Sequence, residues 1–245
     1  MARAREHLQN APIVEAVIDF RVLPQEQVSA NTFADLGASI GEQYSKTGAI
    51  QSIQARFGLV QGKPLDASQT QTDFGWRYQT ATEVAQFRVD GFTFSKLERY
   101  TTWEEVFAEA LRLWNIYVDA AKPRQLSRIA VRYINRMGLP AVNDLGDYLE
   151  APPKLPAPIP QVIREFLTRV YVRDEKRNAS AVIVQALEPR IDPNIISLLL
   201  DIDAFSEVKE SPRDPGLPQV FEQLRQLKND IFFASITERV AEMYA

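Results

Sequence analysis

The sequence of 245 residues contains no cysteine, only one histidine and no long run of apolar residues. Without cysteine the chain has no disulfides, no thiolate nucleophile and no cysteine-ligated metal centre. No segment approaches the roughly 18 consecutive apolar residues of a membrane-spanning helix, and the first ten residues lack the apolar core of a signal peptide. We therefore expect a protein of the reducing cytoplasm that makes no contact with a membrane.

Motifs for catalysis or nucleotide binding are equally scarce. His7, the one histidine, lies in a tail ahead of the first expected strand, and chain ends seldom hold an imidazole in place for catalysis. The segment from Gly58 to Lys63 resembles a phosphate-binding loop but is one residue too short, and Pro64 replaces the hydroxyl residue that would hold magnesium. These absences predict a protein with no catalytic residue and no cofactor.

The residues that are present predict an α+β fold. Apolar residues at every second position predict strands near 13–23, 52–60, 74–80, 83–89, 92–97, 126–137, 166–173, 179–187 and 196–203. Asp90-Gly91 predicts a tight hairpin between two of them. Apolar residues three and four apart predict helices over 31–44 (capped by Asn31), from Thr102 onward, over 144–149, and over 217–243 with Pro218 in its first turn.

The order of these elements repeats along the chain. A shift of about 115 residues places the first strand on 126–137, and a shift of 114 places Val106-Phe107 on Val220-Phe221. We interpret residues 1–245 as a single domain of two pseudo-repeats, about 11–123 and 124–245, with an extended proline-rich crossover at 151–160. The expected architecture is a curved antiparallel sheet with helices packed on one face. Two unrelated halves with similar patterns are the alternative.

Arginines recur along one face of the expected strand at 126–137. Arg124, Arg128, Arg132 and Arg136 are four residues apart, so all lie opposite the apolar side, where Arg21, Arg169 and Arg173 of other strands can join them. Such a face would clamp phosphate or carboxylate groups bidentately. The alternative is structural, because the same arginines can pair across strands with Glu15, Asp19 or Asp201.

Two further groups of residues have a functional and a structural interpretation. Asp201 and Asp203 are two apart on a strand, so both carboxylates point one way, as ligands of Mg²⁺ or Mn²⁺ do, with Glu15 or Asp19 as added ligands. The structural alternative is an acidic strand end in water or paired with arginine. Aromatic residues of adjacent strands either stack nucleobases or pack under the helices: Trp76, Tyr78, Phe87, Phe92 and Phe94.

Several segments together resemble a known group of proteins. They are residues 12–21, 132–136, 144–149, 200–203 and 232–238, with the segment from Trp103 onward. Over nearly the whole chain the sequence resembles a sporadically distributed bacterial family of unknown function, whose members are solitary proteins of about this length. The patchy distribution of that family would suit mobile or defence-linked genes. The family has no assigned catalytic residues to carry over.

We therefore expect a non-catalytic binding protein that acts on another protein, through the sheet face or the terminal helix, in a defence or toxin-neutralising pair. The expected binding residues are Arg21, Arg128, Arg132, Arg136 and Arg173. Two other functions stay open. One is binding of nucleic acid or a small anion by the arginine face, which the net charge of -4 disfavours. The other is a divalent-metal-dependent enzyme that uses Asp201 and Asp203.

Overall fold

The structure is a computed structural model that describes residues 8–23, 25, 27–56, 59–60, 63–64, 68–142, 144–189 and 192–245. His7 and parts of the segment from Gly58 to Lys63 lie outside the described residues, so the expectations for them stay untested.

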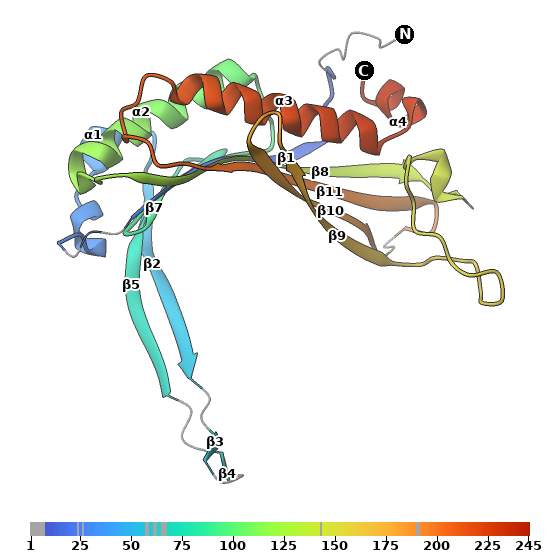
Figure 1. The fold of residues 1–245 in the computed structure, drawn as a ribbon, viewed down its shortest axis with the longest axis horizontal. Coiled ribbons are helices and arrows are strands. Elements are labelled where there is room, and N and C mark those ends of the chain that lie inside the picture. The colour runs from blue at the N-terminus through green and yellow to red at the C-terminus, as the bar shows by residue number, and fades with distance from the viewer. Residues whose placement is uncertain are drawn as a thin grey trace.

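Within the described residues, nine strands form one open antiparallel sheet in the order β2-β5-β6-β7-β1-β8-β11-β10-β9 (Figure 1). Their bounds are β1 Ile13–Val22, β2 Lys46–Arg56, β5 Ser68–Gln79, β6 Glu83–Arg88, β7 Gly91–Leu97, β8 Leu126–Pro140, β9 Phe166–Asp174, β10 Ala179–Glu188 and β11 Ile195–Glu207. The short strands β3 Leu59–Val60 and β4 Lys63–Pro64 pair separately. The expected α+β class is confirmed.

The two long helices, α2 Trp103–Ala121 and α3 Leu217–Ser235, lie on the same face of the sheet (Figure 1). The shorter helices are η1 Ala30–Phe33, α1 Gly37–Ile40, η2 Leu145–Asp147 and α4 Glu238–Met243. We call the opposite, uncovered side of the sheet the open face. The β2–β5 hairpin projects away from α2 and α3, so the open face is the inside of a bend in the sheet (Figure 1).

The core forms where the apolar side of β1 meets both long helices. Alternate residues of β1 are fully or almost fully buried, because period two places them all on the helix side. The ring of Phe20 stacks on Trp114 of α2 with centroids 4.3 Å apart, and its centroid lies 4.9 Å from that of Phe221 of α3. Burying one such side chain contributes about 1.5–3 kcal/mol, so Phe20 ties both helices to the centre of the sheet.

The strand order is the same in the two halves of the chain. From edge to centre it reads β5-β6-β7-β1 in one half and β9-β10-β11-β8 in the other, with β2 added outside β5. Helices α2 and α3 each contain 19 residues and begin 114 residues apart. This order agrees with the interpretation as two pseudo-repeats, although the duplication itself stays a hypothesis. No helix or strand occurs in the proline-rich segment 151–160.

The helix predicted over 31–44 is wrong for most of its length. The chain forms only η1, whose N-cap is Ser29 rather than Asn31, and the single turn of α1. The Tyr78 hydroxyl lies 2.6 Å from the carbonyl oxygen of Phe33 and accepts a hydrogen bond from the Leu36 amide at 3.1 Å, which replaces helical hydrogen bonds. Gly41, at φ +118°, then ends α1 in a conformation that favours glycine.

The helix predicted over 217–243 is interrupted at Ile236, which is extended at φ −110° and ψ 151°. Ile236 forms a β-bridge with Leu149, and the Thr237 amide donates to the carbonyl of Tyr148 at 3.0 Å. These tertiary contacts outweigh the local helical pattern, so α3 and α4 are separate. The hairpin at Asp90 is confirmed, but its two-residue loop begins one residue earlier than predicted.

Candidate functional site

Strand registers place the predicted arginines and aspartates together on the open face. Asp19 of β1 lies opposite Ala130 of β8, and Arg132 of β8 lies opposite Asp203 of β11. Because side chains alternate, Arg21, Arg128, Arg136 and Asp201 share that side, as expected. Arg124 precedes β8, which begins at Leu126, so the alternation of that strand does not extend to it.

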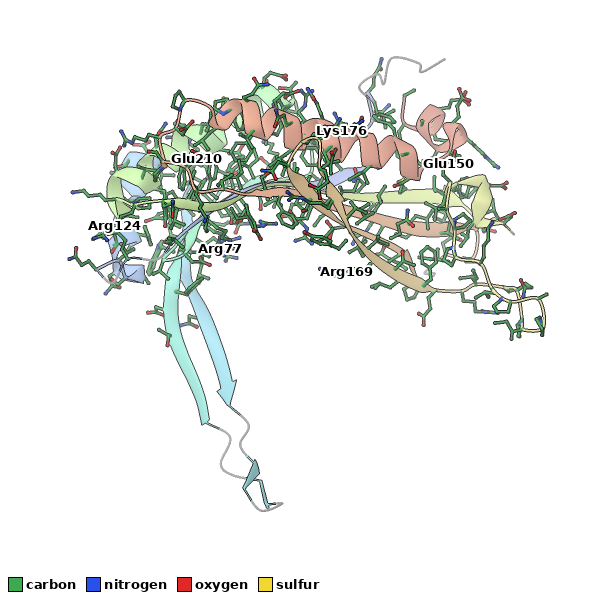
Figure 2. The ribbon with its side chains drawn as sticks, viewed as in Figure 1. Arg77, Arg124, Glu150, Arg169, Lys176 and Glu210 are labelled. Atoms are coloured by element: carbon green, nitrogen blue, oxygen red, sulfur yellow. The ribbon has the colours of Figure 1, made fainter. Side chains whose placement is uncertain are left out.

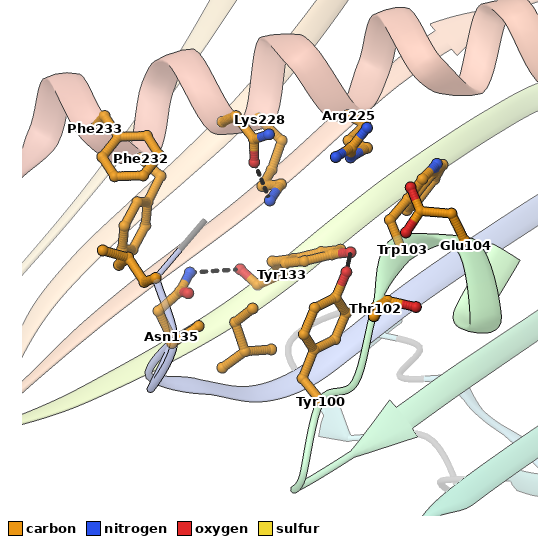
Figure 3. A pocket seen from close by; sticks show the side chains of 14 residues that line it. Tyr100, Thr102, Trp103, Glu104, Tyr133, Asn135, Arg225, Lys228, Phe232 and Phe233 are labelled. Carbon is orange, nitrogen blue, oxygen red and sulfur yellow. Dashed lines mark hydrogen bonds between the residues drawn. The ribbon is translucent and has the colours of Figure 1, made fainter. Parts of the chain in front are cut away.

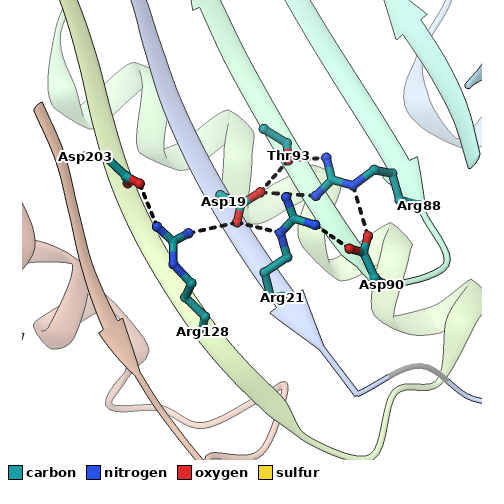
Figure 4. A network of polar contacts seen from close by, with 7 residues as sticks. All are labelled: Asp19, Arg21, Arg88, Asp90, Thr93, Arg128 and Asp203. Atoms are coloured by element: carbon teal, nitrogen blue, oxygen red, sulfur yellow. Dashed lines mark hydrogen bonds and ion pairs between the residues drawn. The ribbon is translucent and has the colours of Figure 1, made fainter. Parts of the chain in front are cut away.

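At the centre of the open face, three arginines and three aspartates interlock around one buried carboxylate (Figure 4). Asp19 accepts hydrogen bonds from the Thr93 hydroxyl at 2.6 Å, Arg21 at 3.0 Å, Arg88 at 3.1 Å and Arg128 at 3.3 Å. Arg128 also donates to Asp203 at 2.7 Å, while Arg21 and Arg88 both reach Asp90. We call this set the acid–arginine cluster: Asp19, Arg21, Arg88, Asp90, Thr93, Arg128 and Asp203.

Charges of opposite sign are equal in number in this cluster, and the balance between burial and the neighbouring arginines differs between Asp19 and Asp203. Burial opposes the ionisation of Asp19, but Arg21, Arg88, the Thr93 hydroxyl and Arg128 outweigh it and hold its pKa below the usual 3.8. Burial raises the pKa of Asp203, because Arg128 and Arg132 compensate only in part. Asp19 is therefore the ionised centre on which the arginines converge.

The other predicted arginines also have partners. Arg132 donates two hydrogen bonds to Asp201, at 2.6 and 2.8 Å, in the bidentate geometry typical of guanidinium and carboxylate. Arg136 donates to both carboxylate oxygens of Glu188 at 3.2 Å.

Arg173, on β9, donates to the Asn178 side chain and lies 3.6 Å from a carboxylate oxygen of Glu175. All five arginines predicted as binding residues are thus held by neighbours within the described chain.

The predicted metal ligands are engaged in the same way. Asp201 is bound by Arg132, and Asp203 is bound by Arg128. Over the part of the chain that the structure describes, no group of three or more histidine, aspartate or glutamate residues is placed to hold a metal ion. The geometry therefore favours the structural interpretation of Asp201 and Asp203 over a metal site.

A hollow of about 270 Å³ opens beside the cluster. Its arginines are Arg21, Arg88, Arg128 and Arg132. Three carboxylates line the hollow beside them: Glu15, Asp19 and Asp203. Each of the four arginines is already ion-paired, to Asp19, Asp90, Asp201 or Asp203, so an anion bound there would have to displace a carboxylate.

The sequence interpretation missed three exposed apolar residues on the terminal strand β9, the most exposed large apolar residues among the sheet side chains that the structure describes. Leu167, Val170 and Tyr171 are 72%, 51% and 58% exposed. Leu167 and Tyr171 share the open face with Arg169, which projects from β9 on the side away from α3 (Figure 2). Alternation of apolar residues and arginine marked β9 as a strand, but only the strand order shows that it lies at an edge.

Side-chain contacts connect this edge to the acid–arginine cluster. The Tyr171 hydroxyl donates to Ser180 at 2.9 Å, and the Tyr171 ring lies 6.2 Å from that of Phe205. The guanidinium of Arg128 lies over the ring of Phe205, 4.4 Å from its centroid. The open face is therefore a continuous surface from the apolar edge to the paired charges.

Fold and site together define a sheet-dominated α+β protein with a helical layer on one side and an open, internally paired polar face on the other. A scan against protein-family models gives no match for the chain, and a search of curated proteins gives none either. None of the helices in the described ranges has both the length and the apolar composition needed to cross a membrane.

Proposed function

We propose that this is a non-catalytic binding protein that holds an extended, acidic segment of another protein along β9 and the adjoining open face. The observation that carries the proposal is the exposure of Leu167, Val170 and Tyr171 on a strand that ends the sheet. Proteins usually protect edge strands with charge, proline, bulges or covering elements, because a bare edge pairs with other chains. An edge strand that exposes apolar side chains can receive an extended segment of a partner as a further strand.

The charges on β9 favour an acidic partner. Arg169 is exposed and makes no ion pair among the described residues, and the only salt bridge of Arg173 in the described chain is with the exposed Glu175 at 3.6 Å. Both side chains lie on the open face beside Tyr171. A segment that brings apolar residues to Leu167 and Tyr171 and carboxylates to the two arginines would satisfy both features.

A second copy of this chain fits β9 less well. Antiparallel pairing of β9 with itself about Val170 brings Arg169 of both copies into diagonal contact, and pairing about Tyr171 places Arg169 opposite Arg173. Like charges directly opposite or diagonal across strands are destabilising. A different, acidic protein is therefore the favoured occupant.

The two other functions have less support from the geometry. Anion or nucleic-acid binding by the arginine face would require breaking the bidentate pair between Arg132 and Asp201 and releasing Arg128 from two carboxylates. A metal-dependent reaction would require Asp201 to leave Arg132 and Asp203 to leave Arg128 before either could bind a metal ion. We further propose that the chain and its partner form a defence or toxin-neutralising pair. Identification of the partner tests this part of the proposal.

The test uses the tagged full chain to capture partners from its own host at low and high salt. We expect one stoichiometric protein, held through an acidic segment, and protection of β9 amides from hydrogen exchange in the complex. Leu167→Lys and Arg169→Glu should each weaken capture at least tenfold, since both side chains are exposed and the fold should survive. Leu23→Lys, at a residue 52% exposed outside the strands, is the matched control.

Three results would contradict the proposal. They are equal capture by the β9 variants, unprotected β9 amides in the complex, and a purified chain that occupies β9 by forming a stable dimer. Nucleic acid that elutes only at high salt would instead favour the arginine face.

A further inference from the structure

A pocket of about 360 Å³ lies on the helix side of the sheet, between α3, the start of α2 and the central strands β1 and β8 (Figure 3). This volume lies within the range of small-molecule sites, about 300–1,000 Å³. Its walls are rich in aromatic side chains: Tyr100, Trp103, Tyr133, Phe232 and Phe233. The pocket is separate from the open face, so the inference below is independent of the proposed function.

Lys228 of α3 enters this pocket with its side chain almost fully buried. The residue is 7% exposed, and its ammonium nitrogen lies 3.7 Å from the ring centroid of Tyr133. It donates to the Asn229 side chain at 2.5 Å but forms no salt bridge with a carboxylate in the described chain. Burying a cation without an opposite charge is costly, and the aromatic face returns only part of that cost.

Hydrogen-bond donors outnumber acceptors around Lys228. The ammonium has three N–H groups, and Asn229 occupies one of them. The hydroxyls of Tyr100 and Tyr133 share one hydrogen bond of 2.8 Å, which leaves one hydroxyl hydrogen for a further acceptor. The guanidinium carbon of Arg225 lies 5.6 Å from the Trp103 ring centroid, but this arginine is already ion-paired with Glu222 at 3.0 Å and leaves the charge of Lys228 uncompensated. The one carboxylate that lines the pocket, Glu104, is exposed at its rim.

We propose that this pocket binds a small organic carboxylate, with its carboxylate on the ammonium of Lys228 and its flat apolar body among the aromatic side chains. The anion supplies the opposite charge that Lys228 lacks and accepts the unused N–H and O–H donors. The rings of Tyr100, Tyr133 and Trp103 provide flat surfaces for an aromatic or conjugated body.

Binding should depend on pH through Lys228. Burial, with a smaller effect of Arg225, lowers the pKa of Lys228 to about 7 in the empty pocket. Burial also raises the pKa values of Tyr100 and Tyr133, so both hydroxyls stay neutral donors. The change of charge on Lys228 near neutral pH should therefore govern binding. A bound carboxylate favours the ammonium, so affinity should fall as pH rises above 7, by up to about tenfold per unit.

The experiment measures binding of cinnamate to the full chain by calorimetry between pH 6 and 8.5, with benzoate as a shorter acid and cinnamamide as the uncharged match. We expect cinnamate to bind, cinnamamide to bind at least tenfold more weakly, and the affinity for cinnamate to fall across the pH range. Lys228→Met keeps the chain length and removes the charge, so it should fold and lose the preference for the acid. Lys176→Met, at an exposed lysine on the β9–β10 turn, is the control and should change nothing.

The unmodified protein keeps the test decisive even if the Lys228 variant fails to fold. The proposal is overturned if neither acid binds at 10 mM, if cinnamamide matches cinnamate, or if the affinity is constant from pH 6 to 8.5. Equal binding of cinnamate by folded Lys228→Met would likewise assign Lys228 a purely structural role.

Discussion

Replacing Asp19 with asparagine tests whether the acid–arginine cluster depends on a single carboxylate. Asp19 has a side chain that is 11% exposed, and it is shared by Arg21, Arg88 and Arg128. Asparagine keeps the size of the side chain but leaves three guanidiniums with only Asp90 and Asp203. Removing one partner from a buried ion pair costs about 3–5 kcal/mol. We expect Asp19→Asn to lower the free energy of unfolding by that amount.

Asp90→Asn is the matched control, because it also removes one carboxylate from the cluster. Asp90 is more exposed, at 27% of its side chain, and asparagine suits a turn as well as aspartate does. A cost of about 1 kcal/mol is expected there, as for partly exposed ion pairs. Urea denaturation followed by circular dichroism measures both variants, and equal losses, or a loss below about 1 kcal/mol for Asp19→Asn, would refute the reasoning.

The pH dependence of stability independently tests whether the negative charge of Asp19 stabilises the fold. The pKa of Asp19 is lower in the folded protein than the usual 3.8, so its contribution is fully present above that value and is lost as pH falls through the folded-state pKa. The stability difference between the unmodified protein and Asp19→Asn should therefore be constant near neutral pH and shrink in acid below about pH 4. A difference that persists unchanged in acid would show that geometry rather than charge causes the effect.

Two further substitutions test the backbone and the core. Gly91→Ala should lower the free energy of unfolding by more than about 2 kcal/mol, because Gly91 has φ +149° and an added Cβ would lie 2.0 Å from the carbonyl oxygen of Phe20. Gly48→Ala is the control, because open space surrounds Gly48, and it should change the urea midpoint little. Trp114→Phe should lower the free energy of unfolding by about 1–3 kcal/mol more than Trp76→Phe does. Of these two indoles, only that of Trp114 donates a buried hydrogen bond, to the carbonyl of Pro212 at 2.9 Å. Equal decreases of the thermal unfolding temperature in the two variants would contradict this.

Period-two patterns located most strands of the sheet correctly because the large apolar residues of those strands alternate with polar ones and lie mainly on the helix side. The register of β1 and β8 confirms the predicted separation of apolar and charged faces. The helix predicted from Thr102 onward is also confirmed as α2, and Thr102 caps it through a hydrogen bond from the Glu105 amide. Local patterns failed where distant residues compete for the backbone, as Tyr78 does near Phe33 and Leu149 does at Ile236.

The sites were less predictable than the fold, because they depend on which strands become neighbours. The sequence offered both a ligand-binding and a paired interpretation of Arg128, and only the order β1-β8-β11 places it between Asp19 and Asp203. The position of Lys228 in the sequence does indicate that it is unusual. It follows Leu224 by four residues and precedes Phe232 by four, so helical spacing places a lysine where an apolar residue is expected.

The central position of β1 has a consequence for synthesis of the chain. β1 emerges before the strands with which it pairs, and its partners lie far downstream: Thr93 and Arg128, which contact Asp19, are 74 and 109 residues away. During translation an apolar strand must therefore wait without a partner on either edge, the situation in which strands aggregate. Glu15, Asp19 and Arg21 alternate with its apolar residues, which is the placement of charged gatekeepers that limit strand aggregation. We expect the charges of Asp19 and Arg21, which pair in the folded sheet, to limit aggregation of the nascent strand as well.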